Sequence, residues 1–192
     1  MSGVAPLPDL SFLELEIELE EYGNAFLTLK AGGQSFVVEG SYVHQSFHDL
    51  LAAAINLEIG LWRRQIVQFE LEPGELRITL NPQYHTPSHT RYVKLVVEEF
   101  ENSPGFENSN EPGISRFTAY LEHTSFSRAV LEAMREFASA PEHVFEKHWG
   151  EPFPQKGFRA LAIAIETENR SPVPAVEALA SIRVLPSRED ND

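Results

Sequence analysis

The chain contains no cysteine and is poor in basic residues, with 15 Lys and Arg against 29 Asp and Glu among 192 residues. Without cysteine there can be no disulfide, thiolate metal site or cysteine nucleophile. The formal net charge of −14 disfavours unaided binding to nucleic acid or to an anionic membrane. No apolar run approaches the roughly 18 residues of a membrane span, and the first residues lack a signal-peptide pattern. We therefore expect a cytoplasmic protein with no nucleic-acid or membrane partner.

Hydrophobic residues make up 42% of the chain and include 13 Phe, which is enough for a packed core. The length fits one ordinary domain. We predict a short lead over residues 1–11, a single domain over residues 12–168, and a tail over residues 169–192. The tail is rich in Pro, Ala and charge, and we expect it to be partly flexible.

Strict alternation marks the first segment, from Leu13 to Glu20. Apolar residues at odd positions and glutamates at even positions are typical of a strand with one buried face and one wet face. Two further β-rich runs, 25–30 and 35–39, flank Gly32-Gly33 and predict a hairpin. The opening of the chain is therefore predicted to be a three-stranded antiparallel meander.

Residues 41–61 change to helical spacing, with Ser46 as the predicted N-cap and Gly60 as the end of the helix. Further strands are predicted, and the intervening segments 81–90 and 102–113 are predicted loops. These strand predictions cover residues 65–72, 75–80, 91–101 and 115–122. Helices are predicted over residues 125–137 and 141–149, whereas residues 156–168 fit either a helix or a strand. Segregated strands and helices indicate an α+β fold, with an antiparallel sheet built from two strand meanders and helices packed on one face.

The row of Glu14, Glu16, Glu18 and Glu20 is the most prominent charged feature, because residues 1–50 hold eight acids and a single base. Two interpretations stay open. The row can be a solvated strand face that prevents aggregation, or a docking face that steers a basic partner. Lys30 and Thr28, on the next predicted strand, are placed to relieve the repulsion among the glutamates.

Histidine pairs four residues apart provide weak candidates for a metal site. The best of these pairs is His85 and His89, in a predicted loop, and His44 and His48 form a second at the start of the first helix. Neither pair has a third ligand at a suitable spacing. A third group, His143, Glu146 and His148, is explained by a surface helix that ends in basic residues.

Other catalytic patterns are missing from the sequence. There is no G-x-S-x-G turn, no phosphate-binding glycine loop and no H-E-x-x-H motif. The cluster Trp62-Arg63-Arg64 is the one basic-aromatic run, and it fits the end of a helix better than a nucleic-acid site. We expect no cofactor and no catalytic residues.

Three further pieces carry a resemblance. They are Gly40-Ser41-Tyr42 with the helix that follows, Phe69 to Glu75 with its E-P-G-E turn, and Trp149 to Pro154 with its W-x-E-x-F-P pattern. Together with the strand and helix of residues 117–137, they resemble a group of uncharacterised bacterial α+β proteins. Some of those proteins are of the kind found beside polymorphic toxins as immunity proteins. The resemblance implies no catalytic residues.

The leading functional hypothesis is a non-enzymatic protein-interaction module, with an immunity or antitoxin role as its most concrete form. Its acidic face would block a basic toxin by occlusion. The alternative is a small-molecule- or metal-binding enzyme that uses His44, His48, His85 or His89. A homo-oligomer that pairs through the edge of the first meander is a third possibility.

Overall fold

A computed structural model describes residues 6–20, 23–41, 45–71, 74–101 and 113–168. The strands are β1 (Glu14–Leu19), β2 (Asn24–Ala31), β3 (Gln34–Ser41), β4 (Gln65–Leu71), β5 (Gly74–His85), β6 (Thr90–Phe100) and β7 (Ile114–Glu122). The helices are α1 (Ser46–Glu58), α2 (Ser125–Ser139), α3 (Glu142–Trp149) and α4 (Gln155–Glu168), with a single 3-10 turn, η1 (Thr86–Ser88). The predicted α+β class is confirmed. Residues 156–168 are helical.

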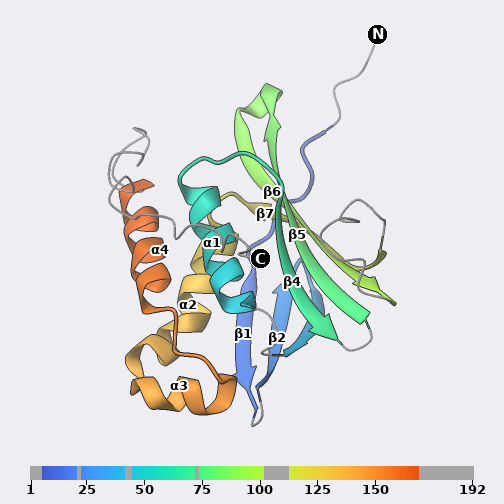
Figure 1. Ribbon diagram of the computed structural model, residues 1–192. Coiled ribbons are helices and arrows are strands. Elements are labelled where there is room, and N and C mark those ends of the chain that lie inside the picture. Colours follow the sequence, from blue (N-terminus) through green and yellow to red (C-terminus); the bar gives the residue numbers. More distant parts are fainter. Residues whose placement is uncertain (1–5, 21–22, 42–44, 72–73, 102–112, 169–192) are drawn as a thin grey trace, which may run out of the picture.

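The strands form two antiparallel sheets, ordered β1-β2-β3 and β4-β5-β6-β7. Each sheet is a meander, because neighbours in the sheet are also neighbours in sequence. The four helices gather on one side of the sheets (Figure 1). The two predicted strand meanders therefore exist, but as two sheets rather than one.

Two contacts join the sheets at opposite edges. At one edge, Ser11 forms a parallel bridge to Leu121 of β7, and its N–H donates to the Tyr120 carbonyl at 2.8 Å. At the other edge, Gly40 of β3 lies so close to Phe69 of β4 that an added Cβ would stand 2.7 Å from the Phe69 ring. The small sheet is thus held against both ends of the larger one.

The core lies between the inner faces of the sheets and the helices. The inner face of the small sheet is apolar because odd residues of β1 and β2, such as Leu15 and Leu27, point inward and are buried. Aromatic rings fasten the C-terminal helices to α1. The Phe47 ring of α1 lies 4.5 Å from Trp149 and 5.6 Å from Phe145, measured between centroids. The W-x-E-x-F-P piece therefore packs largely against helices.

Several local predictions are wrong. Residues 81–90 are no loop, because β5 runs to His85 and β6 starts at Thr90 around the short turn η1. Ser46 does not cap α1; it lies inside the helix, and its hydroxyl donates to the Gln68 carbonyl at 2.9 Å. The predicted turn at Pro73, the loop centred on residues 102–112 and the tail lie outside the described residues.

Candidate functional site

The outer face of the small sheet carries the glutamate row that the sequence singled out. The register places three rows of side chains on this face: Glu14–Lys30–Ser35, Glu16–Thr28–Val37 and Glu18–Phe26–Glu39. Glu14, Glu16, Glu18 and Glu39 are all exposed. Neighbouring positions lie about 5 Å apart across the strands and about 7 Å apart along them. We call these nine positions the acidic face.

Glu20 follows β1 at the same alternation and is exposed. Its backbone N–H donates to the Asn24 carbonyl at 2.9 Å, which begins the turn into β2. The four predicted glutamates therefore share one side of the strand, with Glu20 just beyond its end.

Lys30 is the one basic residue of the acidic face. Its ammonium donates to a carboxylate oxygen of Glu16 at 2.6 Å. This hydrogen bond, with the nearby charges of Glu16 and Glu14, raises the pKa of Lys30 above its ordinary value of 10.5. The predicted relief of repulsion by Lys30 is confirmed. One cation offsets part of the charge of four carboxylates, so the face stays strongly negative.

Apolar side chains lie among these charges. Val37, at the centre of one edge of the acidic face, is 48% exposed, and Phe26 between Glu18 and Glu39 is half-buried. Phe12, just before β1, is 69% exposed. These side chains give the surface apolar area beside its charges, and a protein-binding surface combines both kinds of group.

Two hollows flank Phe12 and Glu14. One, of about 390 Å³, lies between β1 and α2, where Arg128 and Glu132 face the strand. The other, of about 370 Å³, lies beside the Gly32-Gly33 turn and Lys30. The surface next to the acidic face, at the start of β1, is therefore hollowed on both sides of these residues.

The outer edge of β1 is partly occupied. Ser11 pairs with β7, the Leu13 N–H donates to the Ser125 hydroxyl at 2.7 Å, and α2 packs alongside. Covering an edge with a helix is a common defence against edge-to-edge pairing. The open surface of this sheet is therefore its face.

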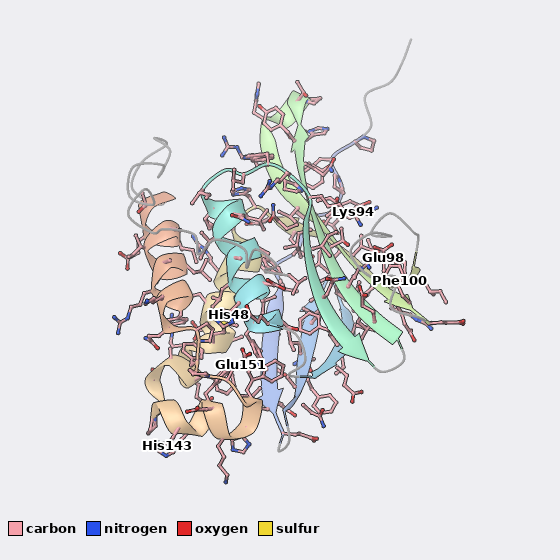
Figure 2. All side chains as sticks on the ribbon, in the orientation of Figure 1. His48, Lys94, Glu98, Phe100, His143 and Glu151 are labelled. Atoms are coloured by element: carbon pink, nitrogen blue, oxygen red, sulfur yellow. The ribbon has the colours of Figure 1, made fainter. Side chains whose placement is uncertain are left out.

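The histidines do not converge. His85 and His89 lie at the tip of the β5–β6 hairpin, where the Nδ1 of His85 is 2.7 Å from the Ser88 hydroxyl and the Nδ1 of His89 is 2.7 Å from the Tyr84 hydroxyl. His48 is exposed on α1, and His143 lies on the separate helix α3 (Figure 2). His44 lies outside the described residues. Among the residues that the structure describes, no three His, Asp or Glu side chains are grouped to hold a metal ion.

A buried ion pair was not predicted from the sequence. Glu75 and Arg77 of β5 are 1% and 0% exposed, and the Arg77 guanidinium donates to the Glu75 carboxylate. Gln68 donates to the same carboxylate oxygen at 3.0 Å, and Arg77 lies over the Phe100 ring at 4.5 Å. Phe100 lies with Lys94 and Glu98 on the side of the sheet away from the helices (Figure 2). Alternation identified Leu76, Ile78 and Leu80 as inward, but it carries no signal that the opposite face is also buried.

Glu39, Phe26 and Val37 were also not predicted as members of the site. Their place follows from the β2–β3 register, which pairs Phe26 with Glu39 and Thr28 with Val37. The sequence contained the signal for this register. If Gly32 and Gly33 form a two-residue hairpin loop, Ala31 pairs with Gln34 and every later pair of the two strands follows.

Comparison of this chain with family models, with curated proteins and with solved structures finds no match. In the part of the chain that the structure describes, no helix is both long and apolar enough to cross a membrane.

Proposed function

We propose that this protein is a non-enzymatic interaction module whose acidic face binds a basic protein partner. The observation that carries the proposal is the exposure of Glu14, Glu16, Glu18 and Glu39 on one sheet face that holds a single base. Four carboxylates within so small an area steer a basic surface toward the face and disfavour acidic competitors. The most concrete form of this function is an immunity protein that occludes a basic toxin.

Two properties of the face support occlusion as the mechanism. The exposed side chains of Val37, at one edge of the face, and of Phe12, just beyond it, provide apolar area to bury in an interface. The glutamates stand on a paired strand, so they are held in place before binding and little ordering entropy is lost.

The test compares two immobilised variants with the wild type as baits in extracts of the source cells. One variant reverses the row (Glu14→Lys, Glu16→Lys, Glu18→Lys, Glu20→Lys). The control reverses four exposed glutamates elsewhere (Glu101→Lys, Glu136→Lys, Glu146→Lys, Glu166→Lys). Both move the formal charge from −14 to −6, because each substitution adds two charges.

We expect the wild type and the control to capture the same basic protein, with a salt-sensitive interaction, and the reversed variant to lose it. An immunity role further requires that the captured protein be toxic and be neutralised by the wild type. Equal capture by the reversed variant would show that the acidic face is not the binding surface.

A further inference from the structure

A second charged surface lies at the far end of the four-stranded sheet. Beyond Leu80, β5 pairs with β6 alone among the described strands, so residues 81–91 form a projecting hairpin. Arg91 on this hairpin lies over the indole of Trp62, with its guanidinium carbon 5.0 Å from the ring centroid. Trp62 in turn stacks on His123, at 5.5 Å between centroids and 8° between planes. With Arg63 and Arg64, these residues form what we call the arginine patch.

The patch is assembled from three separate segments that are each held in place. Gly60, in the left-handed region at φ 78°, ends α1 and turns the chain so that Trp62 lies beside it. The Arg63 carbonyl accepts a hydrogen bond from the Gln65 side chain at 2.9 Å, and Gln65 accepts one from Asn56 at 2.8 Å. The basic side chains therefore project from a fixed base rather than from an unsupported loop.

Among the described residues, the arginines of the patch have no carboxylate partner, whereas several other cations do. Lys30, Arg77, Arg116 and Arg135 each pair with a glutamate. Arg63, Arg64 and Arg91 are exposed, and within the described ranges none of the three forms an ion pair with a carboxylate. Glu58, four residues before Trp62, is buried, and Glu122 pairs with Tyr92, so it lies on the opposite face of the sheet from Arg91. Among the described residues, these three arginines therefore form a cationic surface without an ion pair.

We propose that the arginine patch is a second docking surface and that its partner is an acidic polypeptide segment. Guanidinium groups bind carboxylates through paired, charge-assisted hydrogen bonds. Exposed Trp, Tyr and Arg are the residues that contribute most to protein–protein affinity, and here Trp62 is 39% and Tyr84 51% exposed.

Nucleic acid fits the patch less well. Trp62 already has Arg91 and His123 as stacking partners, so its indole offers a base less open surface. The formal charge of −14 repels a phosphate backbone and an acidic polypeptide alike at long range, so it favours a short acidic segment over an extended charged strand.

The test uses a labelled oligoglutamate peptide as the probe, and measures its fluorescence anisotropy with the full chain at low salt. One variant removes the patch (Arg63→Gln, Arg64→Gln, Arg91→Gln). The control removes three exposed cations of the C-terminal helices (Lys147→Gln, Lys156→Gln, Arg159→Gln). Both variants change the formal charge from −14 to −17, because each substitution removes one positive charge. Circular dichroism checks that both remain folded.

We expect the wild type and the control to bind the peptide, and the patch variant to bind about tenfold more weakly or not at all, the loss equivalent to one charge-assisted hydrogen bond. Binding should also shift the emission of Trp62, since the second tryptophan, Trp149, is only 2% exposed.

Three outcomes would overturn the proposal. The first is equal peptide binding by the patch variant. The second is tighter binding of oligothymidylate than of oligoglutamate at the same salt, which would indicate a nucleic-acid site. The third is a doubled mass in light scattering that only the patch variant abolishes, which would make a second copy of this chain the occupant.

Discussion

The Arg77–Glu75 pair is the residue-scale feature with the largest expected effect on stability. Both side chains are almost fully buried, and Gln68 also donates to the Glu75 carboxylate. Removing one member of such a pair leaves an uncompensated buried charge, which costs about 3–5 kcal/mol. We predict a loss of this size in the free energy of unfolding for Arg77→Met, measured by urea denaturation.

The double variant Glu75→Gln with Arg77→Met serves as the control for that prediction, because it removes both charges and should recover part of the loss. A loss below about 1 kcal/mol in Arg77→Met would contradict the predicted role of the pair.

Lys30 provides a second prediction at the residue scale. Since Glu16 raises its pKa above 10.5, the ion pair contributes fully to stability around neutral pH, and this contribution is lost as the pH rises through the raised value. The pair is exposed, so its effect on stability is small. We predict that the NMR titration of the Lys30 side chain moves to lower pH in Glu16→Gln. An unchanged titration would show that the hydrogen bond does not persist in solution.

At the element scale, the contact of β3 with β4 at Gly40 is a tightly packed junction. A methyl group at this position would stand 2.7 Å from the ring of Phe69, which is itself 1% exposed and cannot swing away. Overpacking of this kind costs about 1–3 kcal/mol. We predict that Gly40→Ala destabilises the protein by this amount in thermal unfolding, whereas Gly33→Ala, with open space around it, is limited to the strain of its positive φ of 78°. The prediction fails if Gly40→Ala lowers the stability of a Phe69→Leu variant as much as it lowers that of the wild type.

The elements also show what sequence alone can predict. The β1 strand and its glutamate row were predictable because alternation over Leu13 to Glu20 has one interpretation. The strands within residues 81–90 were not predictable, because Pro82, Pro87 and the polar residues around them suggest a loop. The chain is nevertheless extended there, because β5 and β6 stay paired as far as His85 and Thr90. Ser46 and Ser125 are residue types typical of N-caps, but their hydroxyls form tertiary hydrogen bonds instead. The Ser46 hydroxyl donates to the Gln68 carbonyl, and the Ser125 hydroxyl accepts from the Leu13 N–H. Long-range pairings of this kind leave no local signal.

The two candidate surfaces also differ in how far the sequence predicts them. The acidic face was identified from the sequence because its main residues lie on one strand. The arginine patch gathers Trp62, Arg91 and His123 from segments about 30 residues apart in sequence, which only the fold brings together.

At the scale of the whole molecule, charge is segregated. The small sheet presents an acidic outer face that holds only Lys30 as a cation, and the far end of the large sheet presents three unpaired arginines among the described residues. Under the two proposals, the acidic face would bind a basic partner and the arginine patch an acidic one. If each surface acts independently, reversing the acidic face should leave oligoglutamate binding unchanged or strengthened.

The most direct test of the central claim is the affinity of a labelled oligolysine peptide for the protein. It is measured for the wild type, for the variant with Glu14, Glu16, Glu18 and Glu20 reversed to Lys, and for the control with four glutamates elsewhere reversed. The two variants have equal net charge, so the comparison separates the face from the overall charge. We predict that the control retains most of the wild-type affinity at low salt, and that the reversed variant loses about tenfold or more. Equal affinity of the two variants would show that the peptide responds only to net charge, and would contradict the assignment of the acidic face as a binding surface.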